Sequence, residues 1–156
     1  MKRLTTLLAT TLLIAAPLAH ATDGFVAVKS PLSAADTMTR LEQTVLSKGL
    51  KVFARIDHAA GARSIDKTLR PTEVIIFGNP KGGTPLMQCQ QTLGIELPLK
   101  ALVWQDAGGQ VWLGYNDPVA MAARHDAADC PVAGNLRKAL EGISAAVVTL
   151  DGQRGA

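Results

Sequence analysis

The sequence lacks the short motifs that mark common catalytic and cofactor sites. It has no nucleophile elbow G-x-S-x-G, no H-E-x-x-H zinc motif and no dinucleotide-binding glycine fingerprint. C-x-x-C-H is missing too, which excludes ordinary covalent attachment of c-type haem. The 13 acidic residues are dispersed, so no carboxylate pair for glycoside chemistry stands out. The sequence therefore names no reaction, and we predict no cofactor.

Long apolar runs are also scarce, with one exception at the start of the chain. The first 21 residues, MKRLTTLLATTLLIAAPLAHA, combine two basic residues, an apolar run and a small-residue ending. The run is interrupted by four threonines and is shorter than the roughly 20 residues that span a bilayer. We therefore predict a signal peptide cleaved after Ala21 and a periplasmic protein, with secretion as the alternative and no membrane association after cleavage.

Clusters of basic residues are missing from the rest of the chain. Removing 21 of 156 residues leaves 135, with 14 basic and 13 acidic side chains and a formal charge of +1. Nucleic acid is not an expected partner, because neutralising several phosphates requires clustered Lys and Arg. No linker or repeat divides the chain, so we expect one domain over 22–150 and a disordered tail over 151–156.

Cysteine occurs only twice, at Cys89 and Cys130. In an exported protein such a pair favours a disulfide, which would close a loop of about 41 residues and stabilise the fold by ~4 kcal/mol in the chain-entropy model. The alternative is a soft copper(I) or zinc site formed with Met87 and His125. Neither C-x-x-C nor H-x-x-x-H occurs, so the disulfide is preferred and no metal is predicted.

Hydrophobic periodicity predicts alternating strands and helices. We expect strands at 24–29, 50–57, 73–77, 99–105 and 110–115, the last two forming a hairpin packed by Trp104 and Trp112. Helices are expected at 33–49, at 85–93 with Thr84 as N-cap, at 118–124, and from Pro131 onward. In the last helix one apolar stripe contains Val132, Leu136, Leu140, Ile143 and Val147. This order predicts an α+β fold with helices on one face of an antiparallel sheet.

The glycine-rich stretch GNPKGGTP, 78–85, allows two interpretations. As a ligand site, it places Lys81 and the free N–H groups of a helix start where an anion would bind. As a turn, its glycines and prolines only shape a strand-to-helix corner. A P-loop would need lysine where Thr84 stands, so we do not expect nucleotide hydrolysis. The ligand site and the turn are compatible.

Two histidines, His58 and His125, remain after removal of the signal. Each lies at the end of a predicted element and follows a charged residue, Asp57 or Arg124. Such a pair can transfer protons near neutral pH or bind a metal. Surface or helix-capping roles are the alternative.

Several longer motifs occur in one order along the chain. They are IDHAAGA (56–62), LRPTEVIIFGNPKGGTPLM (69–87), IELPLKALVW (95–104), YNDP (115–118) and ARH (123–125). Together they resemble the domain-of-unknown-function 302 family over nearly the whole mature chain. The resemblance implies a TBP-like layout of strand, helix, four strands and helix, and a tendency to form homodimers. It implies no activity.

The leading hypothesis is a binding module for a small anionic or polar ligand held beside the glycine-rich stretch. The expected ligand-binding residues are His58, Arg70, Asn79, Lys81, Thr84, Tyr115 and His125. Arg70 and Lys81 would supply charge, and Asn79 would fix the ligand's orientation. Two alternatives stay open: an enzyme that uses His58 and His125 as acid and base, and a dimeric interaction protein without a ligand.

Overall fold

One antiparallel sheet organises the structure. The computed structural model describes residues 20–22 and 24–150, so the expected tail and the expected signal peptide before His20 lie outside the described residues. The elements in chain order are β1 (His20–Thr22), β2 (Phe25–Ser30), α1 (Ala34–Ser47), β3 (Lys51–Asp57), α2 (His58–Arg63), β4 (Thr72–Gly78), α3 (Pro80–Cys89), the 3₁₀ helix η1 (Gln91–Ile95), β5 (Leu99–Gln105), β6 (Val111–Asn116), α4 (Pro118–Arg124) and α5 (Pro131–Val148).

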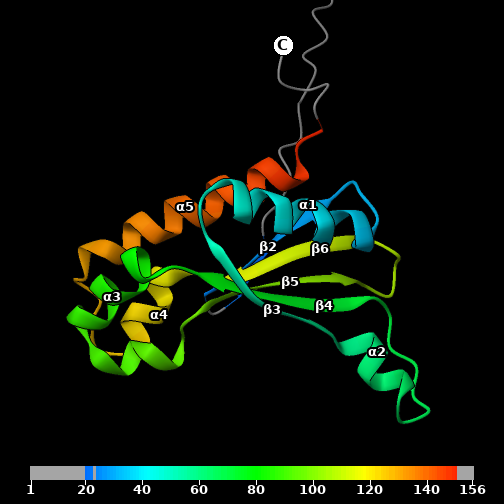
Figure 1. Ribbon diagram of the computed structural model, residues 1–156, viewed down its shortest axis with the longest axis horizontal. Coiled ribbons are helices and arrows are strands. Elements are labelled where there is room, and N and C mark those ends of the chain that lie inside the picture. The colour runs from blue at the N-terminus through cyan, green and yellow to red at the C-terminus, as the bar shows by residue number, and fades with distance from the viewer. Residues whose placement is uncertain (1–19, 23, 151–156) are drawn as a thin grey trace, which may run out of the picture.

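Within these residues the strands have the order β1-β2-β6-β5-β4-β3, and all neighbours are antiparallel. The helices α1 and α5 lie together across one face of the sheet (Figure 1). This confirms the predicted α+β fold and, from β2 onward, the order of strand, helix, four strands and helix. The helices α2, α3 and α4 are inserted into that order at the ends of the sheet.

The strand β1 was not predicted. It pairs with β2 through residues on both sides of the expected cleavage point after Ala21. Cleavage there would leave only Thr22 of this strand, and β2 would become the edge of the sheet.

The core forms where α1 and α5 meet the sheet. Helical spacing places Met38, Leu41 and Val45 on the inner side of α1, and all three are fully buried. The predicted stripe of α5 is buried in its second half, at Leu140, Ile143 and Val147. Alternation places the facing strand residues on the same side, and the buried members are Ile75, Phe77, Ala101, Val103, Val111, Leu113 and Tyr115. Burying one such large apolar side chain contributes roughly 1.5–3 kcal/mol.

The helix α3 begins earlier than predicted. Asn79 is its N-cap, since Oδ1 accepts a hydrogen bond from the N–H of Gly82 at 2.9 Å, and Pro80 is its first residue. Thr84 and Pro85, the expected N-cap and first residue, lie inside the helix. The same start signal, a capping residue followed by proline, occurs twice in this stretch. The predicted start, Thr84 followed by Pro85, is the second of the two, and the helix begins at the first.

Two further helical segments differ from the prediction. The helix expected to run to Leu93 instead ends at Cys89 and is followed by the separate 3₁₀ helix η1. The segment after β3, expected to be a loop, forms the short helix α2, where Asp57 accepts a hydrogen bond from the N–H of Ala60 at 2.9 Å. A helix of six residues with an interior glycine is too short to produce a clear periodic pattern.

The predicted disulfide is present between Cys89 and Cys130, 41 residues apart. It joins the last residue of α3 to the N-cap of α5. Because both sulfur atoms are in the bond, the soft-metal alternative with Met87 and His125 has no thiolate ligands and is wrong. The bond fixes the end of α3 against the helix that covers the sheet.

The sheet face opposite α1 and α5 carries an aromatic cluster of Phe25, Trp104 and Trp112. The Phe25 and Trp104 ring centroids are 5.9 Å apart, and the nearly parallel Trp104 and Trp112 rings are 6.2 Å apart. Gly114 lies beneath these rings. A Cβ atom at this position would be 2.4 Å from Phe25 and 2.9 Å from Trp104, so the close ring packing requires glycine here.

We expect Gly114→Ala to lower the free energy of unfolding by about 2 kcal/mol, because the added methyl group forces the two rings apart. Chemical denaturation followed by tryptophan fluorescence measures this change. Gly142→Ala is the matched control, since nothing lies within 4 Å of its Cβ position and alanine favours the helix. Equal stability of the two variants would contradict the packing role of Gly114.

Candidate functional site

Two hollows lie at opposite ends of the sheet. One is where β4 leads into α3, and the other is where β3 leads into α2. The expected ligand-binding residues are divided between these ends, so the single site predicted from the sequence does not form. Asn79 and Thr84 line the first hollow, and Lys81 is exposed in the first turn of α3 beside it.

His58 and Arg70 lie at the other end. His58 is the exposed first residue of α2, and Arg70 donates a hydrogen bond from Nε to the main-chain oxygen of Gln105 at 3.2 Å. His58 and His125 therefore belong to opposite ends of the sheet and form no acid–base pair.

Tyr115 belongs to the core rather than to either hollow. It is 4% exposed and packs beneath α5. Burial raises the pKa of its hydroxyl, and a hydrogen bond with Ser144 offsets only part of this effect. Its hydroxyl therefore stays protonated and satisfied inside the fold.

His125 takes part in a polar cluster at the end of α4. Its Nδ1 lies 2.9 Å from Oγ1 of Thr92, and its Nε2 lies 3.4 Å from Oε1 of Glu96. Arg124 donates from Nη2 to the same oxygen at 2.9 Å. Burial alone would raise the pKa of Glu96, but the hydrogen bonds and charges of Arg124 and His125 outweigh it and hold the pKa below its usual value. This cluster ties α4 to the segment after η1.

The first hollow, which we call the glycine pocket, has a volume of about 400 Å³. It is enclosed by main chain and apolar side chains from β3, β4, α3, η1, β5 and α5. The lining residues are Leu50, Phe53, Gly78, Asn79, Pro80, Gly82, Gly83, Thr84, Met87, Gly94, Leu97, Pro98, Leu99 and Leu136. A space of this size and composition suits a small apolar molecule.

The glycines of this pocket allow close packing around it. A Cβ atom on Gly82 would lie 3.3 Å from Leu136, and one on Gly83 would lie 3.4 Å from Leu97. Side chains at these positions would push against both leucines. The glycines thus let α3 approach α5 and the segment between η1 and β5 while the space between them stays open.

Of the two interpretations of this stretch, the structure shows the strand-to-helix corner, and it engages two groups that the expected anion site would use. The Oδ1 atom of Asn79 is engaged by Gly82, so it already serves as the helix cap. Thr84 lies within the helix, where its N–H is in register with the carbonyl of Pro80. What the glycine-rich stretch supplies instead is an apolar wall.

A cation lies near one wall of the glycine pocket. Nζ of Lys51 is 5.3 Å from the ring centroid of Phe53, a lining residue that is 49% exposed. Phe53 sits at a register shift of β3 between Val52 and Ala54. Such a bulge turns a side chain away from the regular alternation of the strand.

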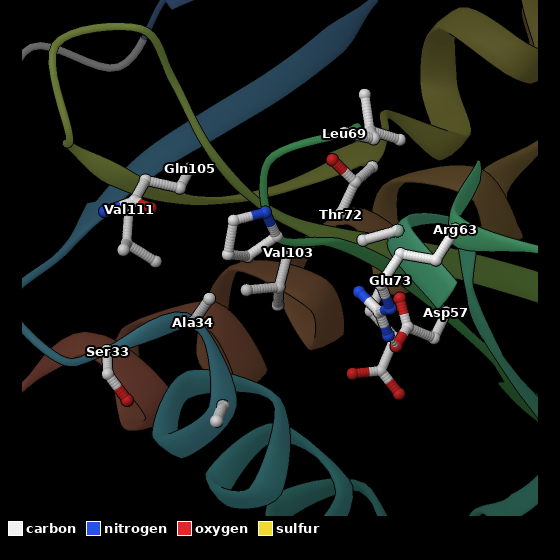
Figure 2. Close-up of a pocket in the computed structure, with 13 residues that line it drawn as sticks. Ser33, Ala34, Asp57, Arg63, Leu69, Thr72, Glu73, Val103, Gln105 and Val111 are labelled. Atoms are coloured by element: carbon white, nitrogen blue, oxygen red, sulfur yellow. Dashed lines mark ion pairs between the residues drawn. The ribbon is translucent and has the colours of Figure 1, made fainter. Parts of the chain in front are cut away.

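The second hollow, which we call the sheet-end hollow, has a volume of about 470 Å³. It lies between the start of α1 and the segment around α2, above Val103 and Val111 (Figure 2). Figure 2 shows Asp57, Glu73 and Arg63 gathered on one side of it. The hollow thus combines an apolar floor with a charged wall.

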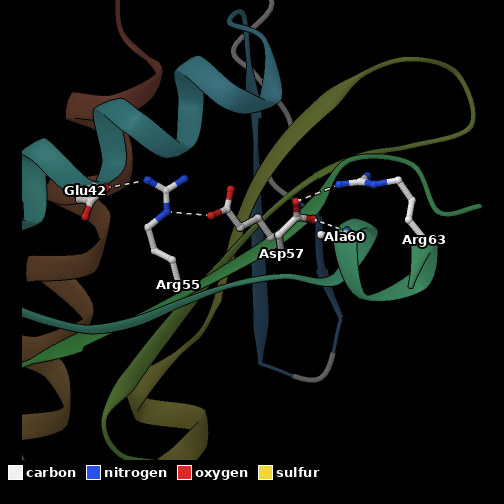
Figure 3. A network of polar contacts seen from close by, with 6 residues as sticks. Glu42, Arg55, Asp57, Ala60 and Arg63 are labelled. Carbon is white, nitrogen blue, oxygen red and sulfur yellow. Dashed lines mark hydrogen bonds and ion pairs between the residues drawn. The ribbon is translucent and has the colours of Figure 1, made fainter. Parts of the chain in front are cut away.

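The charged wall continues as a network towards α1. Arg55 donates from Nη1 to Oε2 of Glu42 and from Nε to Oε1 of Glu73, both at 2.7 Å. Arg63 lies 3.6 Å from the Asp57 carboxylate (Figure 3). The hydrogen bond to Glu73 is the largest influence on Arg55 and raises its pKa further, so Arg55 is always charged.

The structure reveals pocket residues that sequence reasoning missed. Leu99 was expected only as a strand residue and Leu136 only as part of a helix stripe, and Leu97 was given no role, yet all three line the glycine pocket. One signal in the sequence could have indicated an apolar pocket. The glycines of the stretch 78–85 have mostly apolar neighbours, whereas an anion site would have several basic ones. Among the described residues, no group of three or more His, Cys, Asp or Glu side chains is placed to hold a metal. None of the described helices has the length and apolar character that a membrane span requires.

Comparisons with known proteins identify a family model and a solved structure whose descriptions give no activity. The family model of the domain of unknown function DUF302 matches residues 26–146. A crystal structure of an uncharacterised DUF302 protein from Bacillus stearothermophilus superimposes with a TM-score of 0.73 at 17% identity, covering 80% of this chain and 98% of that one. At this identity the likeness concerns the fold alone.

Curated relatives come from Brucella. A protein of Brucella suis called fluoride-specific ion channel FluC 1 is 49% identical over 110 residues, which is 70% of this chain and 43% of that protein. The Brucella melitensis protein called fluoride-specific ion channel FluC 2 is 49% identical over 110 residues and 41% of its length. The chain thus spans less than half the length of these relatives.

We expect Glu96→Gln to lower the free energy of unfolding by about 1 kcal/mol at pH 7, the value of a well-formed surface ion pair. Because folding depresses the pKa of Glu96, its contribution is present above the unfolded pKa and is lost as pH falls through the folded value. The difference from the parent protein should therefore shrink below about pH 4. Denaturant unfolding at several pH values measures it, with exposed Glu141→Gln as the control. A difference that does not change with pH would contradict this role.

Proposed function

The chain belongs to the DUF302 family, whose name assigns no activity, and we propose that it is a small-molecule-binding module whose site is the glycine pocket. The observation that carries the proposal is the pocket itself, an opening of about 400 Å³ walled by glycine main chain and apolar side chains. Ligand pockets in proteins have this size, and most of their lining is apolar.

The residues that line the glycine pocket determine which part of a ligand can enter it. Leu97, Leu99 and Leu136 offer no hydrogen-bonding groups, so an apolar body fits here and a bare inorganic anion does not. The expectation of an anionic ligand is retained at the opening only. Lys51 beside Phe53 and Lys81 in the first turn of α3 favour a negative group there. The proposed ligand is therefore a small amphipathic molecule with an apolar body and an anionic end.

The proposal also includes export to the periplasm and formation of a homodimer. Export through a signal peptide would place the binding module in the periplasm, where the disulfide of Cys89 and Cys130 is stable. Homodimer formation is likewise proposed. The enzyme alternative loses support, because His58 and His125 lie at opposite ends of the sheet. If no ligand binds in the glycine pocket, the remaining alternative, a dimeric interaction protein without a ligand, is favoured.

The binding proposal is tested by filling the pocket. A side chain at Gly78 would extend between Pro98 and Phe53, whose nearest atoms are 3.9 and 4.0 Å from the Cβ position, so the Cβ atom of Gly78→Leu meets no clash, and we expect the rest of the side chain to occupy the opening. We expect hexanoate to bind the parent protein and to lose at least about tenfold in affinity in this variant, equivalent to about 1.4 kcal/mol. Nuclear magnetic resonance titration of the main-chain amides measures both the affinity and the location.

Gly142→Leu is the matched control, because it adds the same side chain at an exposed position with nothing within 4 Å. It should leave hexanoate binding unchanged. Hexanol should bind more weakly than hexanoate if the lysines contribute. Amide shifts that avoid α3 and η1, or equal binding by both variants, would reject the glycine pocket as the site.

A second candidate function follows from the names of the Brucella relatives. Nearly half of each of those proteins matches this chain, so we propose as the alternative that the domain takes part in the handling of fluoride. Titration with sodium fluoride against sodium chloride at equal ionic strength tests this. Saturable amide shifts seen only with fluoride would favour the alternative, and identical responses to both salts would reject direct fluoride binding.

A further inference from the structure

The sheet-end hollow is not used by the proposed function and lies at the other end of the sheet from the glycine pocket. Its floor is formed by the side chains of Val103 and Val111, which are 1% and 7% exposed as part of the core. Leu69, 44% exposed, contributes an apolar patch at the rim. At about 470 Å³, the space is large enough for a small organic molecule.

One wall brings two carboxylates together. Asp57 and Glu73 are direct partners in the antiparallel register of β3 and β4, so both side chains point to the same face. Like charges directly opposite each other on neighbouring strands repel. The Glu73 side chain is only 23% exposed, which weakens the screening of its charge by water. A cation placed between the two carboxylates would relieve this repulsion.

Arg55 and Arg63 neutralise the carboxylates of this wall only in part. Arg55 is shared between Glu42 and Glu73, so the two carboxylates divide one guanidinium. Arg63 approaches Asp57 at 3.6 Å, and its side chain is 66% exposed. An exposed pair at this distance contributes little energy, so Arg63 can be displaced. The network of three acids and two arginines keeps a negative charge beside the hollow (Figures 2 and 3).

The opposite wall does not favour an anion. It consists of the first turn of α1, where the hydroxyl of Ser33 already caps the helix by accepting from the N–H of Asp36 at 3.1 Å. Asp36 also accepts a hydrogen bond from the Ser33 hydroxyl at 2.6 Å, placing a carboxylate at this helix start. A ligand carboxylate would find this helix start already capped, with the Asp36 carboxylate just outside the lining of the hollow.

We propose that the sheet-end hollow binds a small organic cation, a primary ammonium carried on an apolar body. The ammonium group lies between the carboxylates of Asp57 and Glu73 and takes the place of the Arg63 guanidinium. The apolar body lies on Val103 and Val111. An ammonium group fits because it donates three hydrogen bonds and can serve both carboxylates at once.

The test uses n-hexylammonium as the probe, with n-hexanol and hexanoate as ligands of the same chain length. Amide resonance titration should show saturable shifts at the start of α1, in α2 and at the ends of β4 and β5. Hexylammonium should bind at least about fivefold more tightly than hexanol, and hexanoate should produce no saturable shifts in this hollow. Equal shifts from hexylammonium and hexanol would overturn the cation site and leave only an apolar hollow.

Three variants separate the roles of the charged residues. Glu73→Gln retains an oxygen for Arg55, and Asp57→Asn retains a good N-cap for α2, so both preserve the fold while removing charge. Each should weaken hexylammonium binding by about fivefold or more. Arg63→Gln should strengthen it by up to about fivefold, because it removes the competing cation without touching the carboxylates.

Glu141→Gln, an exposed Glu on α5, controls for the general loss of one negative charge and should leave binding unchanged. Weaker binding in Arg63→Gln would overturn the displacement of Arg63. Undiminished binding in both Glu73→Gln and Asp57→Asn would overturn the proposal as a whole. These outcomes are independent of the glycine pocket, since the two hollows share no lining residue and Gly78→Leu should not alter hexylammonium binding.

Discussion

The packing of α1 and α5 against one face of the sheet is the interaction on which the rest of the structure depends. It buries Met38, Leu41 and Val45 of α1 and the second half of the apolar stripe of α5, and it joins them with the strands of the middle of the sheet in one contiguous core. α1 lies over the sheet, whereas the first half of α5 extends past it and packs on α3 and α4 (Figure 1). The two hollows form at the ends of the sheet, where these long helices meet shorter elements that contain glycines, prolines and charged side chains.

The contrast between the two ends follows from the elements that close them. At one end α3, η1 and the start of β5 contribute leucines, prolines and bare main chain, and the resulting space is apolar. At the other end β3 and β4 place the charged residues Asp57 and Glu73 above the buried Val103 and Val111. One fold therefore presents two chemically different spaces that are separated by the length of its own core.

The sequence predicted the parts of the fold that depend on periodic apolar residues. The burial of Met38, Leu41 and Val45 follows directly from helical spacing, and the pairing of the cysteines follows from their number and the expected compartment. The arrangement of the site was less predictable, because it depends on which strand ends meet. Arg70 and Asn79 are close in sequence, but β4 runs between them and carries them to opposite ends of the sheet. Choosing site residues by their chemistry alone does not show that the fold separates them.

The composition of α3 has a consequence for selectivity. Two glycines and an internal proline make it a weak helix on its own, and it is held at its two ends by the Asn79 cap and the Cys89 disulfide. A wall that is anchored at its ends and soft in its middle can bow outward by small amounts while both anchors stay intact. Under the proposed binding function, such a wall would adapt to ligands of different shape, and the glycine pocket would select them by polarity and length more than by outline.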